Sequence, residues 1–340
     1  MRDKMPNPDK SRRRRRWPLY LLYVAAWLAI LEWCVSVFAP GPAFELLRVT
    51  GGSGSQYELS PNKSLIYAPI PNTGEFNNDG YRGKEIPVER RAGTTRLLFI
   101  GDSVTEGLGV ATRERFTDVF AARAGIKTEV INLSVRGYNF LQEVEYLKLK
   151  GLRYRPDHVV FCVAYNDLYL HSGEIADFCQ QVQESKNSAA IKTYYSIRGS
   201  VQDLLMKSSI YRHVFALTLA RRNFHEAITY QLTSIEVKAL VDELSALAKE
   251  YRFRLSFIYL PPRDQEGPMD VFRPIIEAAG IPLLDVETIP KWRQTDSSKL
   301  FLHNDPCHLA PLGHEVVADI LFEDGVRILN IEMAPILLLN

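Results

Sequence analysis

The sequence predicts an α/β protein with a doubly wound, flavodoxin-like parallel sheet of five strands, and three observations support this prediction. Short apolar segments rich in strand-forming residues alternate with amphipathic segments of helical periodicity between residues 96 and 329. The apolar segments are nearly continuous, as expected of strands buried on both faces. The intervening segments are long enough for right-handed helical crossovers, which place helices on both faces of a sheet.

The expected elements follow one another regularly along the chain. The strands are expected at residues 96–100, 129–133, 158–163, 255–260 and 282–286. The helices are expected at residues 113–124, 140–152, 235–251, 270–279 and 311–329. Residues 168–253 contain much more chain than a crossover needs, so they include a helical insertion.

Length and charge limit the classes of protein that fit. The chain has 340 residues, 46% of them hydrophobic and 24% charged, which suits one large domain with additional segments. The net charge of the chain is +1, but residues 1–16 alone carry +6, so the remainder carries −5. This acidic remainder gives no indication of a nucleic-acid-binding domain.

Residues 17–38 form an apolar segment of about 22 residues, long enough to cross a bilayer, with Glu32 as the single charged residue. The basic residues 12–16 precede it directly and predict a cytoplasmic N-terminus with the following domain outside. The apolar segment is longer than the core of a typical signal peptide, and no Ala-x-Ala cleavage site follows. A retained single-pass anchor is therefore favoured over a cleaved signal peptide or a buried soluble helix.

The anchor divides the chain into five expected parts. They are a basic cytoplasmic tail (1–16), a transmembrane helix (17–38), a flexible stalk (39–70), a catalytic domain (71–329) and an apolar C-terminal tail (330–340). The stalk is predicted from its glycine-, serine- and proline-rich composition, most evident in residues 51–55.

Candidate catalytic residues lie near the two ends of the expected domain. Ser103 follows the first expected strand, two residues after Gly101, at the edge of the sheet where ligands bind. A nucleophilic serine needs a base and a carboxylate that orients the base. Asp305 and His308 are three residues apart, which allows a local carboxylate–imidazole hydrogen bond.

Two further motifs follow expected strands, and the four motifs together resemble the SGNH (GDSL-like) hydrolase superfamily, in particular its membrane-anchored bacterial members. The motifs are Gly-Asp-Ser-Val-Thr-Glu-Gly (101–107), Asn-Leu-Ser-Val-Arg-Gly (132–137), Val-Ala-Tyr-Asn-Asp (163–167) and Asp-Pro-Cys-His (305–308). A turn-rich segment at residues 78–83 also resembles the lead-in of such proteins and is given no chemical role. The chain departs from the family pattern at Ala164, where the family usually has glycine.

The resemblance implies a role for each matched residue. Ser103 is expected as the nucleophile, His308 as the general base and Asp305 as the residue that orients the base. The oxyanion hole is expected to comprise the backbone amides of Ser103 and Gly137 and the side-chain amide of Asn166. This machinery would attack an ester carbonyl and form an acyl-serine.

Three functions remain open from the sequence. If water accepts the acyl group, the protein is an esterase acting on O-acetyl or other short acyl esters outside the cytoplasmic membrane. If a sugar hydroxyl accepts it, the protein is an O-acyltransferase of envelope or exopolysaccharide sugars, which would require an acyl-donor membrane partner. A catalytically silent glycan-binding or scaffold domain is the third alternative, and the complete set of three catalytic residues argues against it.

The remaining candidate features are metal or cofactor sites, the insertion and the cysteines. Neither a metal nor a cofactor is expected, because the histidines lack metal-ligand spacing and the glycines lack a nucleotide-binding pattern. Residues 168–253 leave the sheet beside Asn166, so the insertion is either a substrate-shaping cap or ordinary helices at the sheet edge. Cys179 and Cys307 are both expected near the active site in an oxidising compartment, which suggests a disulfide between them.

Overall fold

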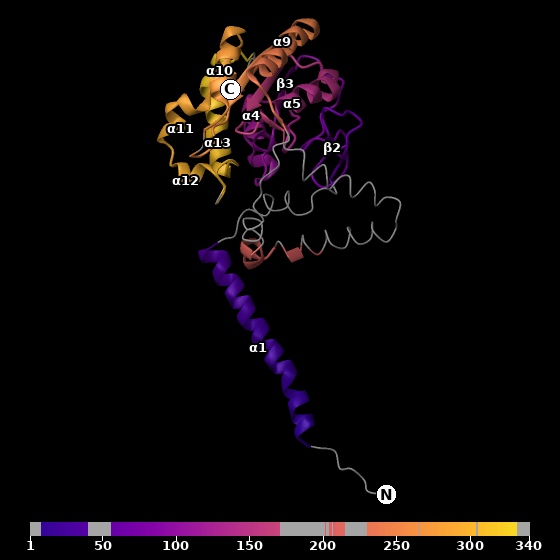
Figure 1. Cartoon of the computed structure of the whole chain (residues 1–340), viewed down its shortest axis with the longest axis vertical. Helices are drawn as coiled ribbons and strands as arrows, with labels where there is room; N and C mark the ends of the chain where they lie inside the picture. Colours follow the sequence, from indigo (N-terminus) through magenta and orange to yellow (C-terminus); the bar gives the residue numbers. More distant parts are fainter. Residues whose placement is uncertain are drawn as a thin grey trace, which may run out of the picture.

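The computed structural model describes residues 8–39, 56–170, 201, 204–205, 207–214, 230–264, 266–303 and 305–331. A long helix, α1 (Pro8–Phe38), extends away from a domain that contains the sheet (Figure 1). The expected stalk residues 40–55, residues 171–200 of the insertion with Cys179, and tail residues 332–340 lie outside the described residues.

The domain contains the predicted sheet of five parallel strands, in the order β4-β3-β5-β8-β9. The strands are β3 (Thr95–Gly101), β4 (Thr128–Asn132), β5 (His158–Val163), β8 (Arg254–Tyr259) and β9 (Leu283–Asp285). The strand order and the parallel directions confirm the doubly wound, flavodoxin-like fold. Each strand agrees with its predicted range to within one residue at either end.

Helices follow the strands as the amphipathic pattern predicts. In the domain they are α3 (Ser103–Glu106), η2 (Thr112–Glu114), α4 (Phe116–Ala124), α5 (Phe140–Tyr146), η3 (Leu147–Gly151), η4 (Leu152–Tyr154), α9 (Ser234–Tyr251), α10 (Met269–Ala278), η5 (Val286–Thr288), α11 (Pro290–Gln294), α12 (Ser297–Leu300), α13 (Pro311–Ile320), η6 (Leu321–Gly325) and α14 (Val326–Ile328). The predicted helices at 140–152 and 311–329 are each divided by a π-helical turn, η3 and η6.

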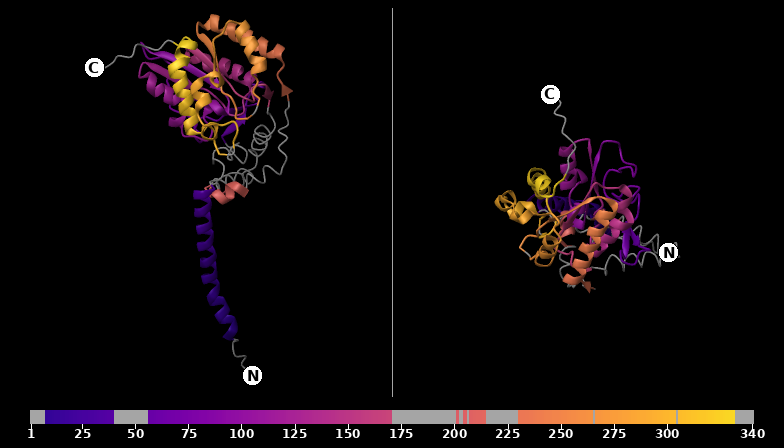
Figure 2. Two further views of the ribbon diagram at one scale, coloured as in Figure 1. Left: turned by 90° about the vertical axis from the view of Figure 1, so that its left-hand side faces the viewer. Right: turned by 90° about the horizontal axis from the view of Figure 1, so that it is seen from above.

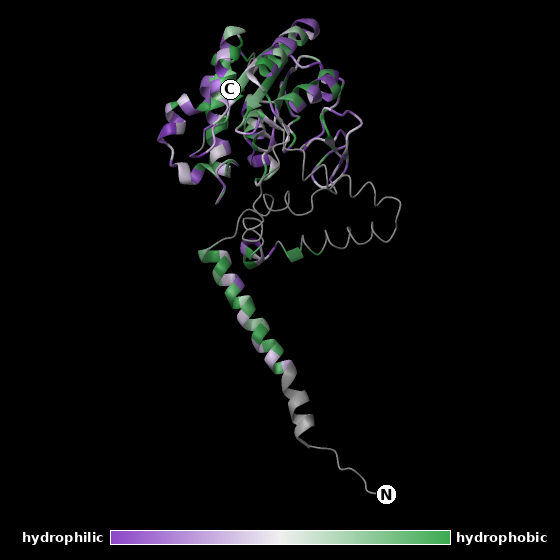
Figure 3. Cartoon of the chain, viewed as in Figure 1, coloured by the Kyte–Doolittle hydropathy of each residue, from purple (hydrophilic) through white to green (hydrophobic). Residues whose placement is uncertain are grey.

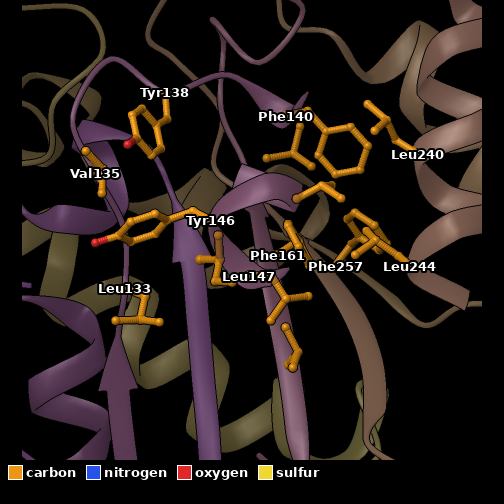
Figure 4. Packing of buried hydrophobic residues seen from close by; sticks show 14 of the residues in the cluster. Leu133, Val135, Tyr138, Phe140, Tyr146, Leu147, Phe161, Leu240, Leu244 and Phe257 are labelled. Carbon is orange, nitrogen blue, oxygen red and sulfur yellow. The ribbon is translucent and has the colours of Figure 1, made fainter. Parts of the chain in front are cut away.

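Two hydrophobic cores lie on opposite faces of the sheet. In β3, Leu98 and Ile100 belong to the core under α5, α9 and α10, whereas Leu97 and Phe99 belong to the core under α4 and α13. This alternation follows from the two-residue period of a strand whose faces are both covered. Figure 4 shows Phe140 of α5 packed among Phe161, Phe257 and leucines of α9.

A short hairpin precedes the sheet. Strands β1 (Tyr57–Leu59) and β2 (Tyr67–Pro69) pair in antiparallel fashion, and the Tyr57 and Tyr67 rings contact edge to face at 5.6 Å between centroids. Both rings are buried in the core under α5. Residues 56–70 were predicted to belong to the flexible stalk. In the structure they pack against the domain, because their aromatic side chains are buried in its core.

The insertion begins and ends at a second small pair of strands. Strand β6 (Tyr169–Leu170) pairs with β7 (Tyr230–Gln231) in a separate two-stranded sheet. Helix α9 then connects β7 to β8. Between these two strands the structure describes residues 201, 204–205 and 207–214. These residues lie at the domain-facing end of α1 in the two side views of that helix, Figure 1 and the left panel of Figure 2.

Helix α1 is long and apolar enough to cross a membrane over Pro18–Phe38, and this part is not buried against the domain. In Figure 3 the ribbon of this part of α1 is coloured mostly as hydrophobic residues. One such helix near the N-terminus is compatible with a membrane anchor or with a signal sequence.

Candidate active site

The first motif forms a sharp turn that places Ser103 at the carboxyl edge of the sheet. β3 ends at Gly101, and the Asp102 carboxylate then caps α3 by accepting a hydrogen bond from the Val104 amide at 2.9 Å. A side chain at position 101 would place its Cβ only 2.5 Å from Thr105 Oγ1, so this close approach requires glycine. Ser103 is consequently the first residue of a helix, with its hydroxyl at the sheet edge.

The structure brings Ser103, His308 and Asp305 together in one chain of hydrogen bonds. Ser103 Oγ lies 2.7 Å from His308 Nε2, and His308 Nδ1 lies 2.7 Å from Asp305 Oδ2. The Nδ1 proton directed to Asp305 leaves Nε2 as the acceptor of the Ser103 hydroxyl proton. The three residues therefore have the arrangement of a nucleophile, a base and a group that orients the base.

Asp305 is held in place by the backbone of its own loop. Its Oδ1 accepts hydrogen bonds from the amides of Cys307 at 2.8 Å and His308 at 2.9 Å. Burial opposes ionisation of Asp305, but the hydrogen bonds from the His308 ring and these amides prevail and lower the pKa of the carboxyl. Asp305 is thus an ionised partner for a histidine that becomes positively charged.

The second and third motifs lie beside the nucleophile. The Val135 amide donates to the Gly101 carbonyl at 3.0 Å, and the Asn166 side chain donates to the Tyr138 carbonyl at 3.3 Å. Gly137 has a φ of 77°, a conformation that glycine adopts readily. The structure therefore places Gly137 and Asn166 at the same edge of the sheet as Ser103.

Two backbone amides at this edge are available for a ligand. Among the described residues, the amides of Ser103 and Gly137 donate no hydrogen bond to another protein group.

Ala164, where the family pattern has glycine, has no positive φ and is fully buried. Its amide donates to Asp167 Oδ2 at 3.0 Å, so the turn that carries Asn166 accommodates alanine.

A buried ion pair joins the nucleophile helix to the loop of Gly137, and the sequence analysis did not find it. Glu106, the last residue of α3, accepts hydrogen bonds from the Arg136 backbone amide at 2.7 Å and from Arg136 Nε at 3.0 Å. Both side chains are buried. The pair fixes the residue that directly precedes Gly137 relative to the helix that begins at Ser103.

Two buried arginines hold the turn after α3. Arg82 donates to the carbonyls of Gly107 and Val110, both at 2.5 Å, and Arg115 donates to the Glu106 carbonyl at 3.3 Å. Cationic side chains stabilise the carbonyl end of a helix. The segment at 78–83, to which the sequence analysis assigned no chemistry, therefore contributes a positioning residue behind the active site.

Three carboxyl groups are buried beneath the active site. Burial raises the pKa of Asp102 to about 6. Burial, with neighbouring carboxylates, also raises the pKa values of Glu143 and Asp167 well above the ordinary range. Burial therefore favours the protonated forms of Glu143 and Asp167. Glu143 of α5 was not singled out in the sequence, because a single glutamate in an amphipathic helix is an ordinary surface residue.

Two other histidines of the domain, His314 and His158, have structural contacts. His314 Nδ1 accepts a hydrogen bond from the Phe116 amide at 3.3 Å, and burial lowers the His314 pKa to about 3. His158 lies 2.8 Å from Ser256 Oγ, and burial lowers its pKa to about 4. In the part of the chain that the structure describes, no group of three His, Cys, Asp or Glu residues could hold a metal ion. Cys179 lies outside this part, so its pairing with Cys307 stays a prediction.

Comparisons with known proteins give a family for this site. The solved structures similar to this chain include the psychrotrophic esterase EstA from Pseudoalteromonas sp., at 13% identity and a TM-score of 0.43, covering 69% of this chain and 99% of that one. They also include a lipase/acylhydrolase from Enterococcus faecalis, at 14% identity and a TM-score of 0.40, covering 67% of this chain and 93% of that one. No curated protein matches the sequence.

The model of the GDSL-like Lipase/Acylhydrolase family matches residues 99–316, which is more than half of the chain. The match begins in β3 directly before the first motif and ends in α13, after the fourth. It confirms the resemblance found in the four motifs. The chain belongs to the GDSL-like lipase/acylhydrolase family of enzymes.

Proposed function

We propose that this enzyme is a serine esterase that hydrolyses carboxylic esters with acetyl or other short acyl groups through an acyl-serine. The family supports esterase or acylhydrolase activity in general terms. The single observation that carries the proposal is the continuous hydrogen-bond chain from Ser103 through His308 to Asp305. This arrangement suits a hydroxyl that loses its proton as it attacks a carbonyl carbon.

In the first half of the reaction, Ser103 Oγ attacks the carbonyl carbon of the ester while its proton moves to His308 Nε2. Asp305 stabilises the resulting imidazolium. The negative charge on the carbonyl oxygen would be stabilised by the backbone amides of Ser103 and Gly137 and by the Asn166 side chain. The carbon–oxygen bond to the alcohol then breaks, and the alcohol leaves with the proton from Nε2.

In the second half, water attacks the acyl-serine and gives its proton to Nε2. Collapse of this second tetrahedral intermediate releases the carboxylic acid, and the proton returns to Ser103. The same acyl-serine would serve an O-acyltransferase if a sugar hydroxyl reached it before water. The observation that favours this second candidate is α1, which would hold the domain beside acyl donors and glycans at a cell surface.

The test uses the full chain in detergent with p-nitrophenyl esters of increasing acyl length. Ser103→Ala should abolish hydrolysis. The control variant Ser245→Ala should retain it, because that serine is on α9 and its hydroxyl donates to the Val241 carbonyl of the same helix at 2.9 Å. Equal hydrolysis by wild type and Ser103→Ala would overturn the proposal. Transfer of the acyl group to an added oligosaccharide would favour the transferase, whereas folded wild type without any turnover would favour a binding role.

We also propose that α1 is retained as a membrane anchor with the domain outside the cytoplasmic membrane. The support is the length and apolar surface of Pro18–Phe38 together with the basic residues before it. N-terminal sequencing of the protein from a membrane fraction tests this proposal. A mature protein that begins after residue 38 would identify a cleaved signal sequence instead.

A further inference from the structure

Glu32, the single charged residue of the apolar span 17–38 within α1, has partners in the insertion. The Ser208 hydroxyl donates to the Glu32 carboxylate at 2.7 Å, and the backbone amides of residues 209 and 210 also donate to it. His213 Nε2 lies 2.8 Å from the Ala39 carbonyl at the end of the helix. These contacts hold the described residues of the insertion against the last turns of α1.

The position of Glu32 defines how deep this contact lies. Glu32 precedes Phe38, the last residue of α1, by six positions. At about 1.5 Å of rise per residue, its Cα lies roughly 9 Å before the end of the helix. The partners of Glu32 are therefore level with the last turns of the apolar span rather than beyond them.

The described residues next to these partners present apolar side chains outward. We use the name juxtamembrane residues for Val201, Leu204, Leu205 and residues 207–214. Leu204 is 64% exposed, and Val201, Leu205 and Val214 are also exposed. Trp33 of α1 is exposed near Glu32, and tryptophan is typical of the membrane interface.

Basic side chains are interspersed with these apolar ones. Lys207 and Arg212 both belong to the juxtamembrane residues, and Arg212 donates to Ser209 Oγ at 2.8 Å. Exposed aliphatic side chains combined with lysine and arginine are the composition of segments that lie at the boundary of acyl chains and anionic headgroups. If these side chains were surrounded by water, their apolar surface would stay exposed and would contribute no hydrophobic stabilisation.

The chain connects this cluster to the active site. Asn166 precedes β6 by three residues, and β6 pairs with β7 where the insertion returns to the sheet. Figures 1 and 2 show the juxtamembrane residues between α1 and the domain. The insertion that leaves beside Asn166 therefore reaches the end of α1.

We propose that the juxtamembrane residues lie in the outer headgroup layer of the bilayer that α1 spans, as a second membrane contact fastened to the anchor through Glu32. The occupant of this surface is the lipid bilayer itself. The contact fixes the domain relative to the membrane and favours esters presented at the membrane surface. It rests on the proposed anchoring by α1, and the experiment separates the two.

The experiment uses the full chain in vesicles of phosphatidylethanolamine and phosphatidylglycerol, in a Cys34→Ser background. A nitroxide is attached in turn to Leu204→Cys, to Leu28→Cys within α1 and to Ile126→Cys, which is an exposed apolar residue of the domain. Collision rates of the nitroxide with oxygen and with a water-soluble nickel complex report its depth. The background without an introduced cysteine gives the signal to subtract.

We expect the nitroxide at 28 to be protected from nickel and the nitroxide at 126 to be open to it. The nitroxide at 204 should be protected from nickel relative to the one at 126 and enriched in oxygen collisions. If the nitroxide at 28 is protected from nickel but the nitroxide at 204 is as accessible as the one at 126, the second contact is overturned and the anchor stands. If the nitroxide at 28 is open to the nickel complex, α1 does not span the bilayer, and this proposal fails with the anchor.

A second variant tests the attachment to Glu32. Glu32→Ala removes both acceptor oxygens and should shift the nickel accessibility at 204 toward the value at 126. Glu32→Gln keeps one carbonyl oxygen and should give a smaller shift. If accessibility at 204 is the same in wild type and Glu32→Ala, Glu32 does not fasten these residues and the proposal is wrong in that part.

Discussion

The two halves of the active site are built in different ways. The proton-transfer half consists of side chains that touch one another directly, and two of its three members, Asp305 and His308, lie on one loop. The proposed oxyanion half would consist of backbone amides and one side-chain amide, which do not hold one another. The loop of Gly137 is held by the buried pair of Glu106 and Arg136, and Asn166 by its hydrogen bond to the Tyr138 carbonyl. The comparison teaches that catalytic side chains can position one another by direct contact, whereas backbone donors depend on supporting contacts made by other residues.

The largest effect is expected in the proton-transfer half. Asp305→Asn keeps the size of the side chain but presents an amide to His308, which favours the wrong tautomer. By analogy with serine proteases, we expect kcat to fall by about 10⁴-fold with a small change in KM. Steady-state kinetics with p-nitrophenyl acetate measures this. A loss of less than tenfold would contradict the orienting role of Asp305.

The next effect is a loss of stability from the support of the oxyanion half. Glu106→Gln leaves the Arg136 guanidinium buried without a full counter-charge, which should lower the free energy of unfolding by about 3–5 kcal/mol. Asp242→Asn, in an exposed pair with Lys238 on α9, should lower it by less than about 1 kcal/mol. Denaturant unfolding measures both.

The double variant Glu106→Gln with Arg136→Met separates stability from positioning. It removes both charges and should recover part of the lost stability. Its kcat should stay below that of wild type, because the loop of Gly137 has lost the ion pair to the nucleophile helix. Full recovery of kcat together with stability would show that the pair is only structural.

Removal of one oxyanion donor should have a smaller effect than Asp305→Asn. Asn166→Ala deletes the side-chain amide at the sheet edge, and loss of one such donor lowers kcat by roughly 10²–10³-fold. KM should change little, since the donor acts on charge that develops in the transition state. Asn78→Ala, which removes an exposed amide that donates to Glu85, is the control. Equal kcat for the two variants would exclude Asn166 from the oxyanion half.

The last prediction concerns the pH dependence of stability. Because the Glu143 pKa is raised well above the ordinary value of 4.5, the folded protein keeps a proton that the unfolded chain releases. Stability therefore falls as pH rises above the ordinary value, by up to about 1.4 kcal/mol per pH unit. Glu143→Gln removes this proton uptake, so the variant should gain stability relative to wild type as pH rises from 5 toward 8. Thermal unfolding at several pH values measures the difference, and a gain that does not change with pH would contradict it.

Much of the fold could be predicted because its signals are local. Each strand is a short, nearly continuous apolar run, so the five strands were found within a residue of their ends. The hairpin at 57–69 was missed, because three-residue strands within a polar, turn-rich segment have no clear period. Its burial depends on contacts such as the one between Tyr67 Oη and the Arg136 carbonyl at 2.8 Å, 69 residues away.

The same reasoning explains what was found and missed in the site. Ser103, Asp305 and His308 were predicted from motifs of a few neighbouring residues, and the structure brings the three side chains together. Glu106 and Arg136 both lie inside recognised motifs, yet their pairing could not be predicted, because charged residues in a turn are most often solvated. Only the three-dimensional structure shows that they are buried together.

The distance in sequence between Ser103 and His308 has a consequence for the timing of activity. The two residues are 205 positions apart, and α13, which follows the His308 loop, packs on α4. During synthesis the nucleophile emerges early, whereas its base arrives only with the last helices. A nascent chain held in the membrane by α1 would therefore carry an unactivated serine until folding of the domain is nearly complete. Activity thus reports complete folding, and partly made or partly unfolded chains would not cleave esters indiscriminately.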